Sequence, residues 1–273
     1  MFPIEMQHIG KIDAVGTVQV FGYSAKQIDA HTADMVYLNY AGPPTASDAV
    51  WAMLIERRAR GLRLVEEELR RSWLVAWGVM NETYFLFDTK PVPVVGYQRS
   101  KRHSQFAGSA AYGYCESRKL HYFGYKLVTM TTLAGLPVVC ELVPANLDER
   151  EAAEAMLFYL HNCDLFGDKG FIGQEWQARM RHLTGNRIWT VKRTNQHDQN
   201  PAPFDALLCR VRERIEGTFN AIQNTGRNLE RLLAKNIVGL CTRIIAKIAS
   251  HALKLLLRRD FGIDVQTFVF SSA

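Results

Sequence analysis

Short apolar runs alternate along this chain with longer segments of helical periodicity. The runs suit buried strands because they are short, rich in β-branched and aromatic residues, and bounded by turn residues. Strands are predicted at residues 84–88, 120–132, 136–143, 164–167 and 187–192. Apolar residues at helical spacing predict helices from about residue 50 onward, and at 149–161, 173–183, 204–222 and 228–259. This order of elements predicts an α/β fold.

The connections between these elements indicate how the strands pair. The turn at 133–135 is short, so the strands on either side of it should form an antiparallel hairpin. A crossover helix leads to the strand at 164–167, which should therefore run parallel to the first strand. Pro91 and Pro93 exclude a helix directly after the first strand. A polar, basic loop is expected at 97–104.

The N-terminal part of the chain has a weaker pattern. Residues 1–46 show no clear period, and Ser47 and Asp48 can cap a helix that begins near Val50. Arginines lie between the apolar positions of this helix. Two interpretations remain open: an amphipathic helix with a solvated basic face, or part of a helical DNA-binding domain.

Composition and charge restrict the class of protein. Hydrophobic residues make up 48% of the 273 residues, which excludes wholesale disorder. The formal charge of +6 and the pI of about 9.1 favour an anionic partner such as nucleic acid. The five cysteines form no C-x-x-C pair, which favours a reduced, intracellular setting. We expect no secretion signal, and the charges within 237–257 argue against a membrane span.

Three acidic residues lie in local settings that suit metal ligands. Asp88 closes the apolar run Tyr84–Phe87, Asp168 closes the run at 163–167, and Glu216 lies in a late predicted helix. Two carboxylates at strand ends and one on a helix can converge on one or two Mg²⁺ ions, which prefer oxygen ligands and take few of them from protein. Paired metal ions can clamp both the attacking and the leaving oxygen of a phosphodiester.

Each of these acids also has a structural interpretation. An aspartate at a strand end often forms a turn or caps a helix, and Asp168 begins a sequence that suits a plain turn. Glu213 lies on the same helix and competes with Glu216 as the candidate ligand. In the structural interpretation Arg212 and Glu216 form a simple surface ion pair, worth a few tenths of a kcal/mol. Asp164 is too distant to share the metal, since four residues of extended strand span roughly 13 Å.

Four motifs occur together and in order: Phe87-Asp88-Thr89-Lys90-Pro91, Phe123-Gly124-Tyr125-Lys126-Leu127, Gly167-Asp168-Lys169-Gly170-Phe171 and Arg212-x-x-x-Glu216-x-x-Phe219-Asn220. In this combination the sequence resembles a DDE transposase of a bacterial insertion sequence over residues 84–262. The resemblance implies an RNase H-like core of five mixed strands with flanking helices, preceded by a mainly helical region. We therefore expect an N-terminal region at 1–80, a catalytic domain at 81–262 and a tail at 263–273.

The same resemblance implies roles for individual residues. By position, Asp88, Asp168 and Glu216 match the catalytic and metal-binding triad of the family, and Arg212 matches the basic residue one helical turn before the glutamate. The first and fourth strands would be neighbours, with the glutamate helix across their ends. The implied cofactor is Mg²⁺, for which Mn²⁺ can substitute. Basic residues near the triad are expected to hold DNA phosphates: Lys90, Arg99, Lys101, Arg102, Lys169, Lys192, Arg193 and Arg212.

The implied function is metal-dependent cleavage and strand transfer at the ends of an insertion sequence. The partners would be double-stranded DNA, both element ends and target, and a second copy of the chain in a homodimer or larger assembly. The expected location is the cytoplasm, on the nucleoid. Two alternatives remain open: a structure-specific nuclease that cuts without joining, and a DNA-binding relic without catalysis, since the N-terminal region resembles the family least.

Two further patterns have both a structural and a functional interpretation. Basic residues of the last helix recur every three or four positions and form a stripe opposite an apolar face: Arg243, Lys247, His251, Lys254 and Arg258. Whether this stripe meets DNA is open. Aromatic residues alternate with cations from 112 to 126, and strand packing is favoured there over stacking on unpaired bases.

Overall fold

The computed structural model describes residues 46–96, 105–116, 119–192, 199–224, 229, 232 and 234–263, and of residues 46–60 it describes the backbone only. The chain divides into two compact units, Met1–Gly61 with Phe268–Ala273, and Leu62–Thr267. In the smaller unit the described residues belong to helix α2 (Ala46–Ala76). The larger unit contains the sheet and every described candidate residue.

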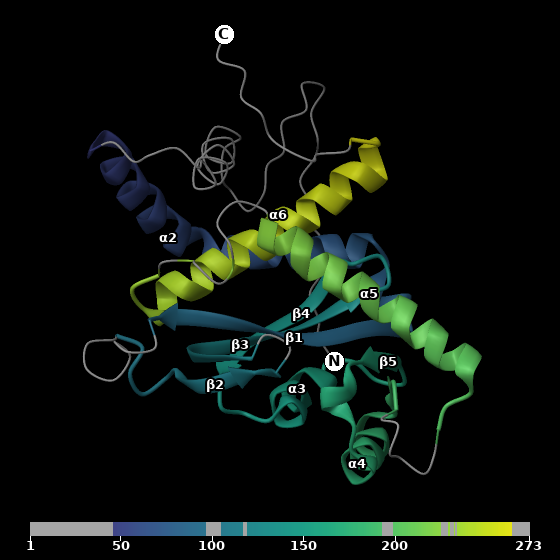
Figure 1. Cartoon of the computed structure of the whole chain (residues 1–273). Coiled ribbons are helices and arrows are strands. Elements are labelled where there is room, and N and C mark those ends of the chain that lie inside the picture. The colour runs from purple at the N-terminus through teal and green to yellow at the C-terminus, as the bar shows by residue number, and fades with distance from the viewer. Residues whose placement is uncertain are drawn as a thin grey trace. The chain divides into compact units, whose positions relative to one another are not determined.

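Six strands form one mixed sheet in the order β2-β3-β1-β5-β6, and β4 also pairs with β3 (Figure 1). The strands are β1 (Tyr84–Val95), β2 (Ala111–Cys115), β3 (Leu120–Thr132), β4 (Pro137–Pro144), β5 (Asp164–Gly167) and β6 (Arg187–Thr190). β3 pairs with β4 antiparallel and β1 pairs with β5 parallel, as the connections predicted, and β1 also pairs with β3 antiparallel. The α/β class is therefore confirmed, and the element order is that of an RNase H-like core.

The sheet of the described residues has one strand more than the five predicted, because β2 was not foreseen. One edge of β3 is shared between two partners: β4 pairs with residues 125–131, and β2 pairs with residues 120–124. β2 has no buried residue, so its sequence carries no apolar run to mark it. It forms because the first half of β3 would otherwise leave backbone N–H and C=O groups unpaired.

β1 is longer than predicted, continuing past Asp88 to Val95 and through Pro91 and Pro93. Both prolines are paired with β3 on one side of the strand. On the other side β5 pairs only with residues 84–86, so the prolines need no N–H there for a second ladder. Beyond Leu86 this side of β1 has no strand partner among the described residues, which leaves room beside Asp88.

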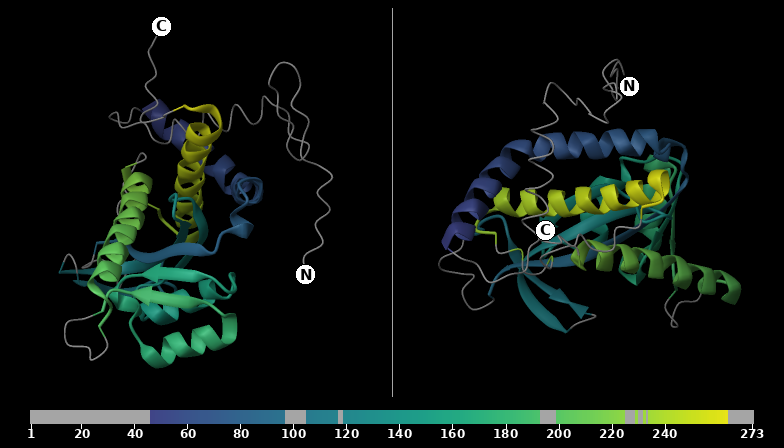
Figure 2. Two further views of the ribbon diagram at one scale, coloured as in Figure 1. Left: turned by 90° about the vertical axis from the view of Figure 1, so that its right-hand side faces the viewer. Right: turned by 90° about the horizontal axis from the view of Figure 1, so that it is seen from above.

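Helices cover both faces of the sheet: α3 (Glu149–Leu157) and α4 (Gln174–Thr184) on one face, α5 (Ala202–Asn224) and α6 (Ile237–Phe261) on the other (Figures 1 and 2). Alternation along β1 divides the core between them. Phe85 and Phe87 pack with Met156 of α3, whereas Leu86 packs with Ile215 of α5. None of the helices in the described part of the chain is long and apolar enough to cross a membrane.

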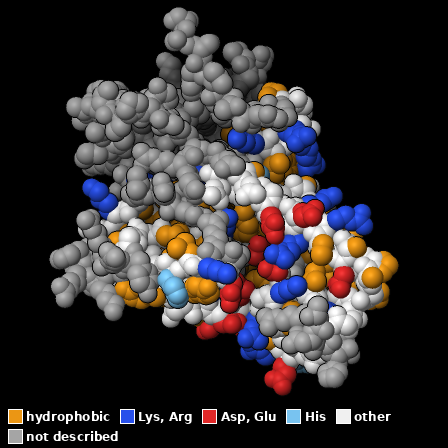
Figure 3. Space-filling model, viewed as in Figure 1, with side chains coloured by type: hydrophobic (Ala, Val, Ile, Leu, Met, Phe, Trp, Pro, Cys, Tyr) orange, Lys and Arg blue, Asp and Glu red, His pale blue; other side chains and the backbone are white. Residues whose placement is uncertain are grey.

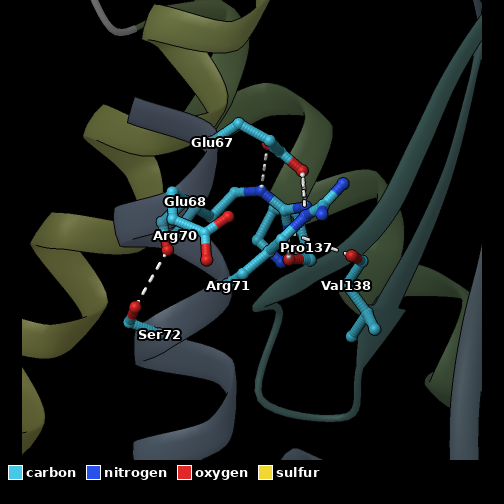
Figure 4. Close-up of polar contacts among 7 residues, drawn as sticks. All are labelled: Glu67, Glu68, Arg70, Arg71, Ser72, Pro137 and Val138. Atoms are coloured by element: carbon cyan, nitrogen blue, oxygen red, sulfur yellow. Dashed lines mark hydrogen bonds and ion pairs between the residues drawn. The ribbon is translucent and has the colours of Figure 1, made fainter. Parts of the chain in front are cut away.

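Arg70 on α2 is a structural residue rather than part of a solvated basic face. The residue is 5% exposed, and Nη1 donates to the carbonyl oxygens of Pro137 (2.8 Å) and Val138 (2.9 Å) at the start of β4. Nε and Nη2 donate to the carboxylate of Glu67 at 2.9 and 2.6 Å (Figure 4). This arginine therefore attaches the helix to the edge of the sheet.

The basic stripe predicted on the last helix is not a continuous surface. Lys247 and His251, two of its members, are 6% and 5% exposed. Nζ of Lys247 donates to the carbonyl oxygen of Ile222 in the last turn of α5 (3.3 Å), and Nε2 of His251 lies 3.0 Å from that of Gly135 in the β3–β4 turn. The spacing of residues along one helix cannot show that another helix and a turn pack on its polar side.

Candidate active site

The parallel pairing of β1 and β5 brings Asp88 and Asp168 to the same level of the sheet. Tyr84 pairs with Asp164 and Leu86 with Phe166, so the paired residues differ by 80 in number, as Asp88 and Asp168 do. Each aspartate comes two positions after the pair Leu86 and Phe166. Because side chains alternate along a strand, both are expected on the face of the sheet that Leu86 and Phe166 share, which is the face covered by α5.

α5 carries Arg212 and Glu216 close to these two aspartates, of which Asp88 lies within β1 and Asp168 directly follows β5. Ile215 and Phe219 bury one stripe of the helix in the core below it. That contact places Arg212, three residues before Ile215, beside the sheet. Its guanidinium contacts two acids at once: Nη1 lies 3.0 Å from Oδ1 of Asp168, and Nη2 lies 3.3 Å from Oε1 of Glu216. Asp168 and Glu216 are therefore joined through one cation.

These side chains line a cleft of about 1100 Å³, together with residues from β2, β3 and the start of α3. Figure 3 shows acidic side chains gathered near the middle of one face of the molecule, with Lys and Arg side chains around them. The cleft brings all three predicted acids to one place. Among the residues that the structure describes, however, no group of three His, Cys, Asp or Glu side chains is close enough to hold a metal ion.

The environment of Asp88 disfavours its negative charge. Burial raises the pKa of Asp88 to about 7, and the charges of Asp168 and Glu149 add to the rise, while the N–H of Thr89 and the charge of Arg212 oppose it. Oδ1 of Asp88 accepts from the N–H of Thr89 (2.7 Å). A further positive charge close to Asp88 would keep it ionised at neutral pH.

Three further acids line the cleft, Glu116, Asp148 and Glu149, and sequence reasoning missed Glu149, the first residue of α3. Its Oε1 accepts from the hydroxyl of Thr89 (3.1 Å). Its Oε2 lies against Gly170, where an added Cβ would stand only 1.5 Å away. In the sequence Glu149 resembles any acid in the first turn of a helix, where it complements the helix dipole, so no local signal separates it from Glu151.

Asp164, which was predicted to lie too far from Asp168 to share the metal, has a structural role. It is 7% exposed, with Oδ2 2.5 Å from Nη2 of Arg187 and Oδ1 accepting from Nε1 of Trp189 (2.7 Å). Both partners lie on β6. Asp164 therefore links two strands and has no oxygen directed into the cleft.

The basic residues predicted to hold DNA divide into three groups. Lys90, Lys169 and Arg212 line the cleft. Lys192, just after β6, is not among the residues that line it. The remaining four lie outside the described residues: Arg99, Lys101, Arg102 and Arg193.

Comparison with known proteins gives one match. A family model described as a transposase DDE domain matches residues 79–237. This span is more than half of the chain, and it includes Asp88, Asp168, Arg212 and Glu216. No curated protein and no solved structure matches the chain.

Proposed function

The chain belongs to the transposase DDE domain family, and on that premise we propose that it cleaves and joins DNA at the ends of an insertion sequence. The proposed catalytic and metal-binding residues are Asp88, Asp168 and Glu216. The observation that carries the proposal is the shared level of Asp88 and Asp168 on adjacent parallel strands, with Glu216 lining the same cleft. The proposed catalytic domain is 81–262, between the N-terminal region 1–80 and the tail 263–273.

The residues present suit a divalent metal. Asp88 and Asp168 supply carboxylate oxygens, which Mg²⁺ prefers, and Mg²⁺ takes few ligands from protein. Burial, together with repulsion from Asp168, raises the pKa of Asp88, and a cation between the two acids would favour the ionised carboxylate. Glu216 pairs with Arg212 and would complete the set once that pair opens. We propose Mg²⁺, with Mn²⁺ as a substitute.

The protein groups around the acids suit the handling of a phosphodiester. Bound Mg²⁺ lowers the pKa of water and stabilises a leaving 3′ oxygen. Lys90 and Lys169 line the same cleft as the acids and would hold phosphate oxygens. Arg212 would neutralise charge that develops on the phosphate. No covalent bond to the protein is needed, since the attacking oxygen comes from water in cleavage and from the freed 3′-OH in joining.

The proposed partners are double-stranded DNA, as element end and as target, and a second copy of the chain on the DNA. The proposed location is the cytoplasm, on the nucleoid. Because binding of phosphates releases counterions, affinity for DNA should fall steeply between 50 and 200 mM salt, by roughly 10³-fold if six phosphates are contacted. An affinity independent of salt would contradict a phosphate-binding cleft.

The test is an assay of the purified full chain on DNA that flanks its gene, with Mg²⁺, Mn²⁺ or EDTA. Nicks at the element end followed by strand-transfer products support the proposal. Nicks without joining favour a nuclease, and metal-independent binding without nicks favours an inactive DNA-binding protein. The matched pair is Glu216→Gln, which should abolish cleavage, and Glu213→Gln on the same helix, which should not. Wild-type cleavage in Glu216→Gln overturns the assignment of the third acid.

A further inference from the structure

Glu149 connects the two chain segments that carry Asp88 and Asp168. Thr89, which donates its hydroxyl to Oε1 of Glu149, directly follows Asp88 on β1. Gly170, against which Oε2 lies, follows Asp168 by two residues in the 3-10 turn after β5. The carboxylate of Glu149, on α3, therefore contacts both segments at the junction between β1 and β5. The positions of these residues in the sequence do not show that the two segments lie near α3.

We propose that Glu149 is a positioning residue for the metal centre: its carboxylate holds the Asp88 and Asp168 segments at one spacing and adds negative charge that attracts a divalent cation. The inference rests on the proposed function, because it takes Asp88 and Asp168 as the metal ligands. Glu149 acts through Thr89 and through the shared field of the cleft rather than by contact with substrate.

The charge of Glu149 is not required for its hydrogen bond. A glutamine in its place would still offer an oxygen to the hydroxyl of Thr89. The negative charge of Glu149 instead lies in the same cleft as Asp88 and Asp168. A charge that is unfavourable in the metal-free protein becomes favourable once a cation is bound, because opposite charges attract most strongly where water is partly excluded.

Gly170 gives a second means of testing the same contact. Alanine at this position would place Cβ 1.5 Å from Oε2, so the carboxylate would have to move. Oε2 is the far end of a flexible side chain, which can rotate without moving the backbone. Gly170→Ala therefore keeps the charge in the protein but displaces it, whereas Glu149→Gln keeps the position and removes the charge.

The experiment measures Mn²⁺ affinity of the full chain without DNA, by isothermal titration calorimetry, for the wild type, Glu149→Gln, Gly170→Ala and Glu151→Gln. Glu151 is the control, because it is an exposed acid in the same helical turn. Replacing groups that orient metal ligands lowers metal affinity by about 10- to 100-fold. We expect a loss of that size in the first two variants, none in the control, and recovery of DNA nicking by Glu149→Gln at high Mn²⁺. Thermal unfolding in EDTA should be unchanged or shifted upward in Glu149→Gln.

Unchanged Mn²⁺ affinity in either Glu149→Gln or Gly170→Ala overturns the proposal. A lower unfolding temperature of Glu149→Gln in EDTA also overturns it, since Glu149 would then serve the fold alone. Asp88→Ala separates this failure from failure of the proposed function. If Asp88→Ala binds Mn²⁺ as the wild type does, then Asp88 is not a ligand and the proposed metal centre itself is wrong.

Discussion

Replacing Asp88 with asparagine should stabilise the metal-free protein and at the same time abolish DNA cleavage. The charge of Asp88 is held in a partly buried cleft beside Asp168 and Glu149, which raises the pKa of Asp88 to about 7. Asparagine keeps an oxygen for the N–H of Thr89 and carries no charge. The unfavourable charge is then absent, and so is a metal-binding carboxylate.

The size of the effect follows from the pKa. The rise from 3.8 to about 7 corresponds to about 4 kcal/mol, at about 1.4 kcal/mol per pH unit. Asp88 is partly exposed, so solvent screening reduces this to about 2 kcal/mol. The pKa of Asp88 is higher in the folded than in the unfolded chain, so protonation of Asp88 stabilises the folded protein. This stabilisation is fully present below pH 3.8 and is lost as the pH rises through about 7.

Urea unfolding in EDTA at pH 5, 6, 7 and 8.5, followed by circular dichroism, measures this dependence. We expect the difference in unfolding free energy between Asp88→Asn and the wild type to grow by roughly 1 kcal/mol across this range, because about a third of the loss is already complete at pH 5. Adding Mg²⁺ should stabilise the wild type and leave Asp88→Asn unchanged. Parallel pH curves for the two proteins, or equal stabilisation by Mg²⁺, would refute the reasoning.

Three further predictions separate catalytic from structural residues. Arg212→Ala should change the free energy of unfolding by less than about 1 kcal/mol, because the side chains of Arg212 and Glu216 are 38% and 53% exposed. The same variant should slow DNA cleavage by roughly 100-fold, and wild-type cleavage would contradict this. Asp164→Ala should destabilise the fold by about 1–3 kcal/mol in urea unfolding, because it removes a buried carboxylate that accepts from Trp189 and pairs with Arg187 on β6. Asp168→Ala should not, and equal losses would contradict the division of roles. Burial, with the nearby charge of Lys254, lowers the pKa of Lys247 to about 8. The unfolded chain therefore binds more protons than the folded chain between pH 8 and 10.5, and the free energy of unfolding should rise with pH in that window. Lys247→Met should remove this rise, as measured by thermal unfolding at pH 7.5 to 10.5.

Part of the fold could be predicted because neighbouring residues settle it. The strands at 120–132 and 164–167 have the predicted bounds, because the first is rich in β-branched and aromatic residues and both are bounded by turn residues. The parallel direction of the first and fourth strands followed from the crossover helix between them, whereas their adjacency was implied by the family resemblance. The catalytic acids could be proposed only because four short motifs occur in the order of a known family, and the family match now covers all four.

The tertiary structure decided which polar residues face solvent, which face the core and which face the cleft. Glu149 and Glu151 are adjacent acids in one helical turn, but only Glu149 reaches Thr89 and Gly170, because those segments pack at one end of α3. Lys247 lies on the polar side of α6 in the sequence, yet the last turn of α5 buries it. A sequence records the order of side chains along one element, whereas their neighbours come from elements brought together by the packing of the whole core.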